Sequence, residues 1–191
     1  MPKIAEIERT PNPNALKFVL REPLTYGVSR SFDSQAEAQA DPLARALFDV
    51  PHVANVFYVD HWITVTQDGG ADWGELSKKI AVPIREAPAA EAQSHAYAAS
   101  SGGGHPALDD ERLTDTERQK LEIIADLFDE RVRPYLQGDG GDLYMVELEG
   151  SLLKVHYQGA CGSCPSSLSA TLTGIESLVH SVDPELQLVP V

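Results

Sequence analysis

Cys161 and Cys164 are the residues of this chain best suited to chemistry, and they are its only two cysteines in 191 residues. Two residues separate them, so both sulfur atoms can turn toward one point. This spacing is common to zinc, iron–sulfur and dithiol redox sites. Two cysteines alone cannot supply the disulfide framework of a small secreted protein. We therefore interpret the pair as a metal-binding or redox site.

The residues around the pair suit a ligand site at the start of a helix. Residues 159–167 read Gly-Ala-Cys-Gly-Ser-Cys-Pro-Ser-Ser. Gly159 and Gly162 let the backbone approach a bound group closely, and Pro165 fits the first position of a helix. Cys164 would then lie beside the helix N-terminus, whose positive end favours the thiolate form that binds metal.

The number of ligands leaves several kinds of site open. Structural zinc and the common iron–sulfur clusters take four ligands, mostly cysteine, and this chain supplies two. An isologous homodimer would bring a second pair to the two-fold axis. Within one chain, His156 or His180 could complete the set, although strand histidines such as His156 more often face solvent. A dithiol oxidoreductase would use the same pair, but it usually has a long remainder of its domain downstream.

The elements that must position the pair form a small α+β domain, residues 113–191. Thr114 is a helix N-cap with acidic residues in the first turn, and Pro134 ends or kinks the helix that follows. Two strands, 143–148 and 152–157, precede the cysteines. A helix begins at Pro165, and a final strand spans residues 186–191, which gives the order αββαβ.

A glycine-rich turn, residues 138–142, precedes the first of these strands. Its carboxylates, Asp139 and Asp142, could suggest a site for a hard cation. Two carboxylates fall short of the six to eight oxygens that calcium takes, whereas glycines suit a tight turn. We interpret the segment as structural.

A second α+β domain, residues 1–86, is predicted upstream, with helices on one face of a sheet in the order ββαββα. Asp41, followed by proline, begins one helix, and residues 72–80 form the other. The strands are expected at residues 4–7, 15–20, 53–59 and 62–66. The domain has no cysteine, and we expect His52 and His61 at loop edges and Trp62 and Trp73 in the core. Because no catalytic or metal site is predicted in this domain, we expect it to dock a partner or client protein.

Residues 87–112 join the two domains. They contain almost no large apolar side chains and include the run Ser-Ser-Gly-Gly-Gly, so they cannot bury enough surface to offset chain entropy. The sequence predicts a flexible linker here.

The overall composition excludes several classes of function. The formal net charge of −14 makes nucleic acid and anionic membranes poor partners, and no apolar run approaches a membrane span. The first residues resemble neither a secretion signal nor a transit peptide, which predicts a cytoplasmic protein. No nucleophile–base pair or nucleotide loop indicates an enzyme.

Larger stretches of the chain resemble a known family. Residues 133–142 (Arg-Pro-Tyr-Leu-Gln-Gly-Asp-Gly-Gly-Asp), 159–167 and 174–176 resemble the NifU-like C-terminal domain. Residues 10–18 (Thr-Pro-Asn-Pro-Asn-Ala-Leu-Lys-Phe) and 63–66 resemble the N-terminal domain of Nfu proteins. One departure lies in residues 168–173, where the family usually has a Thr-Leu-Lys run and this chain has no lysine.

The resemblance implies an iron–sulfur cluster scaffold or carrier. Cys161 and Cys164 match the family's ligands, so the expected cofactor is a 4Fe-4S cluster shared between the cysteine pairs of a homodimer, with 2Fe-2S possible. Such a carrier would be loaded by upstream assembly machinery and would deliver its cluster to apo iron–sulfur client proteins. A zinc-stapled dimeric interaction protein and a thiol oxidoreductase are the alternatives.

Overall fold

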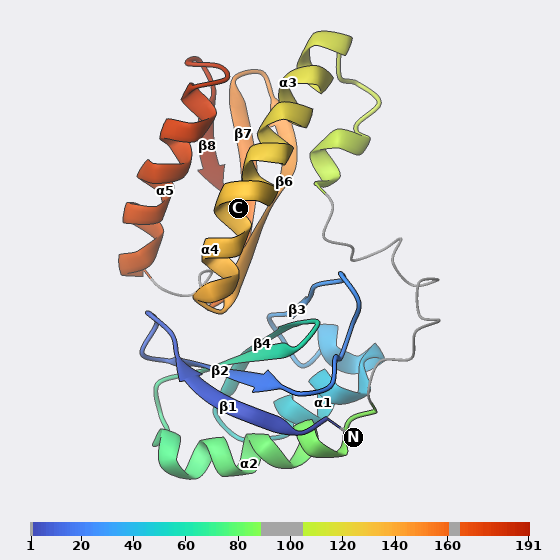
Figure 1. The fold of residues 1–191 in the computed structure, drawn as a ribbon, viewed down its shortest axis with the longest axis vertical. Helices are drawn as coiled ribbons and strands as arrows, with labels where there is room; N and C mark the ends of the chain where they lie inside the picture. Colours follow the sequence, from blue (N-terminus) through green and yellow to red (C-terminus); the bar gives the residue numbers. More distant parts are fainter. Residues whose placement is uncertain (1, 89–104, 161–164) are drawn as a thin grey trace. The chain divides into compact units, whose positions relative to one another are not determined.

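The computed structural model describes residues 2–88, 105–160 and 165–191, without the side chains of 165–171. The chain divides into two compact units, Met1–Gly103 and Gly104–Val191 (Figure 1). Each unit is a sheet with helices packed on it, which confirms the predicted α+β class. None of the described helices is long and apolar enough to cross a membrane.

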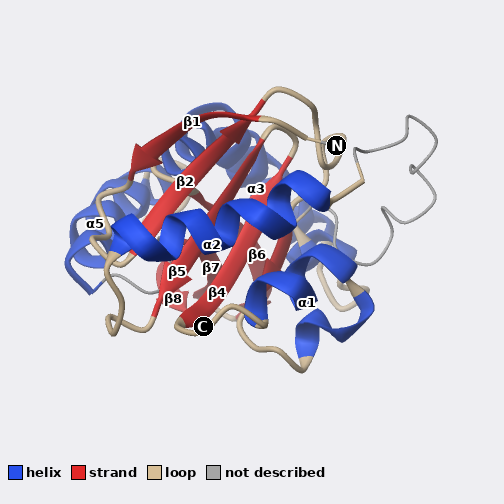
Figure 2. Ribbon diagram, turned by 90° about the horizontal axis from the view of Figure 1, so that it is seen from below, coloured by secondary structure: helices blue, strands red, loops and turns tan. Residues whose placement is uncertain are grey.

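The N-terminal unit is built on a five-stranded antiparallel sheet of order β1-β2-β5-β4-β3. Its helices α1 and α2 lie across one face of this sheet (Figure 2). Alternate strand residues point to that face, so Phe18, Val56 and Ile63 pack with Leu47 of α1 and Ile80 of α2. The element bounds are β1 (Ile4–Arg9), β2 (Ala15–Leu20), β3 (Arg30–Phe32), η1 (Glu37–Ala40), α1 (Pro42–Phe48), β4 (Val53–Val59), β5 (Trp62–Gln67) and α2 (Trp73–Glu86).

Several elements of this unit differ from their prediction, among them β1, which runs to Arg9, and η1, which was not predicted. Strand β3 was not predicted, because three residues are too short for a period of two to stand out. Helix α2 runs six residues beyond its predicted end, with Pro83 inside it. The longer helix keeps its apolar stripe buried through Ile84, and that burial offsets the hydrogen bond that proline cannot donate.

The C-terminal unit has a three-stranded mixed sheet of order β6-β7-β8, in which β6 and β7 are antiparallel and β7 and β8 parallel. Helix α5 makes the crossover that a parallel pair requires. The core joins Leu121 and Phe128 to Leu143 and Val155 of the sheet and Val179 of α5. The element bounds are η3 (Pro106–Asp109), α3 (Asp115–Leu127), η4 (Phe128–Val132), α4 (Arg133–Gly138), β6 (Gly141–Glu149), β7 (Leu152–Gly159), α5 (Pro165–His180) and β8 (Gln187–Pro190).

The segment before α3 is folded, although the sequence analysis placed residues 87–112 in a linker. His105 and Ala107 are buried, and Ala107 belongs to the core of the C-terminal unit. The Arg118 guanidinium donates to the carbonyl oxygens of Leu108 and Asp110. Ala107, the partly buried Leu108 and a set of polar contacts hold this segment, and so few apolar residues did not stand out in its composition. At the other end of the predicted linker, Ala87 is buried in the core of the N-terminal unit, so the prediction is wrong there as well. Residues 89–104 lie outside the described residues.

The long helix of the C-terminal unit changes geometry before Pro134. Helix α3 begins with a capping box, in which Thr114 and Glu117 each bond the other's backbone amide, as the N-cap prediction requires. It passes into the π-helical segment η4 and then into α4, where Pro134 occupies the first turn. The chain thus remains helical through Pro134, and the departure from α-helical geometry is the π-helical segment that precedes it.

Candidate metal centre

Cys161 and Cys164 lie outside the described residues, but the elements on both sides of them are described. Strand β7 ends at Gly159 and helix α5 begins at Pro165. The cysteines therefore belong to the connection between a strand end and a helix start, as the flanking sequence predicted.

The strand end is held by the glycine-rich turn before β6. Gly141 pairs with Gly159, and the amide of Ala160 donates to the Gly140 carbonyl oxygen over 3.1 Å. Gly140 has φ +85° and Gly159 has φ +67°, conformations that a side chain would strain. Ala160 is 3% exposed. The backbone is thus fixed up to the residue before Cys161.

An ion pair fastens this turn to helix α4. Arg133 donates from Nε and Nη2 to the two carboxylate oxygens of Asp142, each over 2.8 Å. Asp142 is 2% exposed and pairs with Gln158 on β7. Its Oδ1 also accepts from the amide of Leu143 over 2.9 Å. A bidentate, buried pair of this kind fixes orientation as well as distance.

Arg133 also reaches a second carboxylate. Its Nη1 donates to Asp129 Oδ1 over 2.9 Å. The hydrogen bond to Asp142 raises the pKa of the Arg133 guanidinium despite the opposing effect of burial. Asp142, which the sequence analysis weighed as a cation ligand, is bound by an arginine instead, and Asp139 is exposed.

His105 completes this network from the segment that the sequence analysis assigned to the linker. Its Nδ1 accepts a hydrogen bond from the amide of Met145 over 3.0 Å, and its Nε2 lies 3.4 Å from Asp129 Oδ1. The ring packs edge-on against Phe128. Burial lowers the pKa of the imidazole, although the charge of Asp129 opposes this shift. No periodicity or motif in residues 105–112 indicated this role.

The two histidines considered as extra ligands are each bound to the backbone. His156 Nδ1 donates to the Val191 carbonyl oxygen over 2.8 Å, and its ring lies against Tyr144. His180 Nε2 donates to the Leu186 carbonyl oxygen over 2.9 Å. Among the described residues, no group of three His, Cys, Asp or Glu side chains could hold a metal ion.

The N-terminal unit offers a different set of polar residues. His52, at φ +76°, lies 3.1 Å from Asp68 through Nδ1, and His61 is exposed beside the β4–β5 turn. The hydrogen bond from the Gly70 amide is the main cause of the lowered pKa of Asp68. Both tryptophans were expected in the core; both are half-buried, and Trp73 packs against the core of the N-terminal unit. Trp73 lies at the rim of a groove because its indole donates to the Pro13 carbonyl.

Comparison with known proteins identifies both halves of the chain. Residues 4–91 match the family model "Scaffold protein Nfu/NifU N terminal", and residues 124–189 match "NifU-like domain". The human "NFU1 iron-sulfur cluster scaffold homolog, mitochondrial" is 33% identical over 183 residues, covering 95% of this chain and 69% of the human protein. The protein of the same name from Drosophila willistoni is 30% identical, and the chain spans 62% of its length.

Two solved structures also match parts of the chain. A NifU-like protein from Saccharomyces cerevisiae is 25% identical, with a TM-score of 0.39 over 42% of this chain and 74% of the yeast chain. A Staphylococcus aureus protein is 26% identical, with a TM-score of 0.38 over 43% of this chain and 98% of its own.

The relatives overturn the predicted cytoplasmic location. Both the human and the fly proteins are named mitochondrial, which contradicts the prediction of a cytoplasmic protein. The prediction relied on the composition of the first residues of this sequence, and those residues do not decide the compartment.

The matches extend over both units, and the human relative is matched over more than two thirds of its length. The strand end and helix start on either side of the cysteine pair are those predicted from the flanking residues. This chain therefore belongs to the Nfu family of iron–sulfur cluster scaffold proteins.

Proposed function

We propose that Cys161 and Cys164 bind half of a 4Fe-4S cluster, that the same pair in a second copy binds the other half, and that the cluster is then passed to apo iron–sulfur client proteins. The observation that carries this proposal is the fixed backbone on both sides of the pair. Ala160 is held by Gly140 on one side, and α5 begins at Pro165 on the other.

The ligand count favours a dimer. Four thiolates are the usual complement of a 4Fe-4S cluster, and the chain has two cysteines. Two copies related by a two-fold axis supply four. The cluster would itself form part of the contact between subunits, so it could leave when they separate. A cluster held in this way is cargo, and the protein acts as its scaffold and carrier, with no catalytic turnover.

The Arg133–Asp142 pair stabilises the strand end that precedes the cysteines. It fastens α4 to β6, and β6 holds the end of β7 through the Gly141–Gly159 pairing. We assign Arg133 and Asp142 as positioning residues, because the cysteines follow the strand end that this pair fixes. Thiolates held in place before the cluster arrives need less ordering when it binds.

Anaerobic reconstitution with iron and sulfide tests the proposal. We expect about four irons and four sulfides per dimer, together with a shift from monomer to dimer in sedimentation. Two irons and two sulfides per dimer would replace the 4Fe-4S assignment with 2Fe-2S. One zinc and no chromophore would support the zinc-stapled alternative, and a thiol–disulfide exchange activity without metal would support the oxidoreductase.

The ligands are tested by substitution in the same loop. Cys161→Ser should abolish both the cluster and the cluster-dependent dimer, because an alcohol does not replace a thiolate ligand. Ser163→Ala, which removes a hydroxyl between the two cysteines, should keep both. A stable cluster-bound dimer of the Cys161→Ser variant would show that the ligands are misassigned. Delivery is measured as cluster-dependent activity of an apo 4Fe-4S enzyme mixed with the loaded protein.

We also propose that the N-terminal domain, residues 1–86, docks partner proteins while the segment 87–112 connects it to the cluster-binding domain, residues 113–191. The folded segment 105–112 would belong to the cluster-binding side of this boundary, because Ala107 is part of that core.

A further inference from the structure

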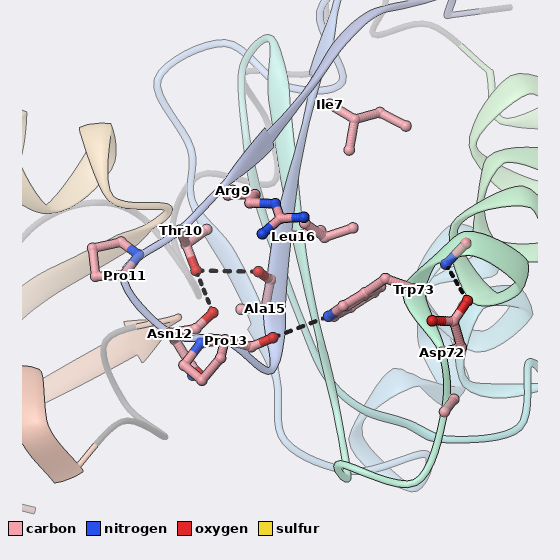
Figure 3. Close-up of a pocket in the computed structure, with 12 residues that line it drawn as sticks. Ile7, Arg9, Thr10, Pro11, Asn12, Pro13, Ala15, Leu16, Asp72 and Trp73 are labelled. Atoms are coloured by element: carbon pink, nitrogen blue, oxygen red, sulfur yellow. Dashed lines mark hydrogen bonds between the residues drawn. The ribbon is translucent and has the colours of Figure 1, made fainter.

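The N-terminal unit has a groove of about 610 Å³ between strand β1, the β1–β2 loop and the first turn of α2 (Figure 3). Ile7, Arg9 and Leu16 line it from the strands, and Trp73 lines it from the helix. All the residues that line it belong to the N-terminal unit. It is therefore a candidate for a binding site separate from the cluster.

The walls of the groove are held in place by their own hydrogen bonds. Thr10 Oγ1 lies 2.9 Å from the Asn12 carbonyl oxygen and 3.2 Å from that of Ala15. The side chain of Asn12, 4% exposed, accepts from the amide of Asn14. Trp73 Nε1 donates to the Pro13 carbonyl oxygen over 3.0 Å. A ligand entering the groove would not need to order this loop, which lowers the entropy cost of binding.

The groove combines apolar surface with one uncompensated positive charge. Ile7 is 45% exposed, although it is a large apolar side chain. Arg9 lines the groove together with Ile7 and Trp73 (Figure 3), and its guanidinium makes no hydrogen bond or ion pair with the described residues. Asp72, on the opposite rim, uses a carboxylate oxygen to accept from the Gly74 amide at the start of α2. The chemistry favours a ligand with an apolar group and a carboxylate.

Strand β1 forms one edge of the sheet, where β2 is its partner among the described strands. Ile7 pairs with Phe18 and Arg9 with Leu16, and both of these partners lie in the core beneath the helices. Directly paired residues share a face, so Ile7 and Arg9 point to the helix-covered side, where the groove lies. An extended peptide added along this edge would place alternate side chains on the same side.

We propose that the groove binds an extended segment of a partner protein, which adds to β1 as a further antiparallel strand. All the strand pairs observed in this sheet are antiparallel. An added antiparallel strand would place a carboxylate opposite Arg9 and, two residues later, an apolar side chain opposite Ile7 and beside Trp73. The recognised pattern is an acidic residue, any residue, then a large apolar residue.

The inference rests on the proposed docking role of the N-terminal domain but not on the cluster. The probe is a fluorescent peptide, Thr-Val-Glu-Thr-Leu-Thr-Val, titrated into the full-length apo protein and followed by anisotropy. Its matched control, Thr-Val-Thr-Glu-Leu-Thr-Val, has the same composition but puts the acid on the opposite face of the strand. We expect the control to bind about tenfold more weakly, the loss of one charge-assisted contact.

Protein variants locate the contact. Arg9→Gln should weaken the probe about tenfold and should remove the difference between the two peptides, because the charge that distinguishes them is gone. Arg21→Gln, at an exposed arginine outside the groove, should bind as the wild type does. Amides on the outer edge of β1 should exchange with solvent more slowly when the probe is bound, as strand addition requires.

Several results would overturn the proposal. Equal binding of the two peptides, loss of affinity in Arg21→Gln, or no added protection of β1 amides would each do so. If the apo protein self-associates and Arg9→Gln abolishes this association, the occupant of the groove is a second copy of this chain and the proposal of a partner protein is wrong. The cluster is a separate readout: Arg9→Gln should load iron and sulfide normally, and Cys161→Ser should bind the probe normally, so each proposal can fail without the other.

Discussion

Each unit buries one aspartate that is bound by an arginine, and the two aspartates lie at different places relative to the proposed binding sites. In the C-terminal unit, Asp142 sits at the turn that holds the strand end before the cysteines. In the N-terminal unit, Asp41 ties the start of α1 to β3 and β4, whereas the groove lies beside β1, at the other edge of the sheet. The Asp142 network is therefore next to the proposed cluster site, whereas the Asp41 network is away from the proposed peptide groove and stabilises the fold of its unit.

The two carboxylates also differ in how they are satisfied. Asp41 caps α1 through the amide of Ala44, accepts from Arg30 Nη1 over 2.8 Å and accepts from the hydroxyl of Tyr58. Burial, followed by the charge of Asp41, raises the pKa of Tyr58. Asp142 instead takes two of its three hydrogen bonds from a single arginine. Removal of Asp142 would therefore leave mainly one buried charge, that of Arg133, without its partner.

The chain allows the two units to be observed separately. Both of its tryptophans, Trp62 and Trp73, lie in the N-terminal unit. Tryptophan fluorescence therefore reports on that unit, while far-ultraviolet circular dichroism reports on both. A substitution that destabilises one unit should move one of these signals selectively.

Asp142→Ala should have the largest effect. It leaves the guanidinium of Arg133, whose side chain is 16% exposed, without its main partner, and removing one member of a buried pair costs about 3 kcal/mol of unfolding free energy. We expect an earlier transition in circular dichroism during urea unfolding, an unchanged tryptophan transition, and reduced cluster loading. Asp139→Asn, in the same turn but exposed, is the control. Full loading in a folded Asp142→Ala protein would contradict the positioning role.

Asp41→Ala should have a smaller effect, and only on the N-terminal unit. It removes a helix cap, which contributes about 1 kcal/mol, and leaves the buried Tyr58 hydroxyl without its acceptor, which costs about 1 kcal/mol more. Arg30 is more exposed than Arg133 and can be rehydrated. The unfolding transition followed by tryptophan fluorescence should shift to lower urea concentration. At urea concentrations below that transition, the folded variant should still bind the peptide probe at the opposite edge of the sheet. A shift confined to the other unit, or loss of probe binding by the folded variant, would break the comparison.

Local signals were readable from the sequence. Asp41 and Thr114 were recognised as helix caps because the amides that they bind lie three residues further along the chain. The strand end and helix start around the cysteines were also predicted, since glycine and proline constrain the backbone directly. The family resemblance, and not the spacing of the two cysteines, indicated iron–sulfur binding.

Contacts between distant segments were not readable. The Arg133–Asp142 pair joins a helix to a strand, and nothing in the residues between them specifies that their side chains meet. His105 binds the amide of Met145, forty residues away. Arg9 carried no signal at all, because its importance comes from the edge position of β1 and from the approach of Trp73 to the loop at Pro13.

The smallest expected effect is a difference between the two units in how their unfolding free energy depends on pH. Burial lowers the pKa of His105 in the folded state, so below the ordinary value of about 6.5 the unfolded chain binds a proton that the folded chain does not. The stabilisation is complete above that value, and it decreases as the pH falls toward the folded pKa. Arg133 opposes protonation of the ring and Asp129 favours it, but burial has the larger influence.

Between pH 7.5 and 5.5 we therefore expect the unfolding free energy of the C-terminal unit to fall more than that of the N-terminal unit. His105→Asn is the sharpest control, since an amide oxygen can still accept from Met145 but cannot titrate. This variant should lose the excess pH dependence while its circular dichroism spectrum is unchanged. A wild-type C-terminal unit that becomes more stable over this interval would show that Asp129 holds the proton on His105, and the ring would then act as a cation in the network.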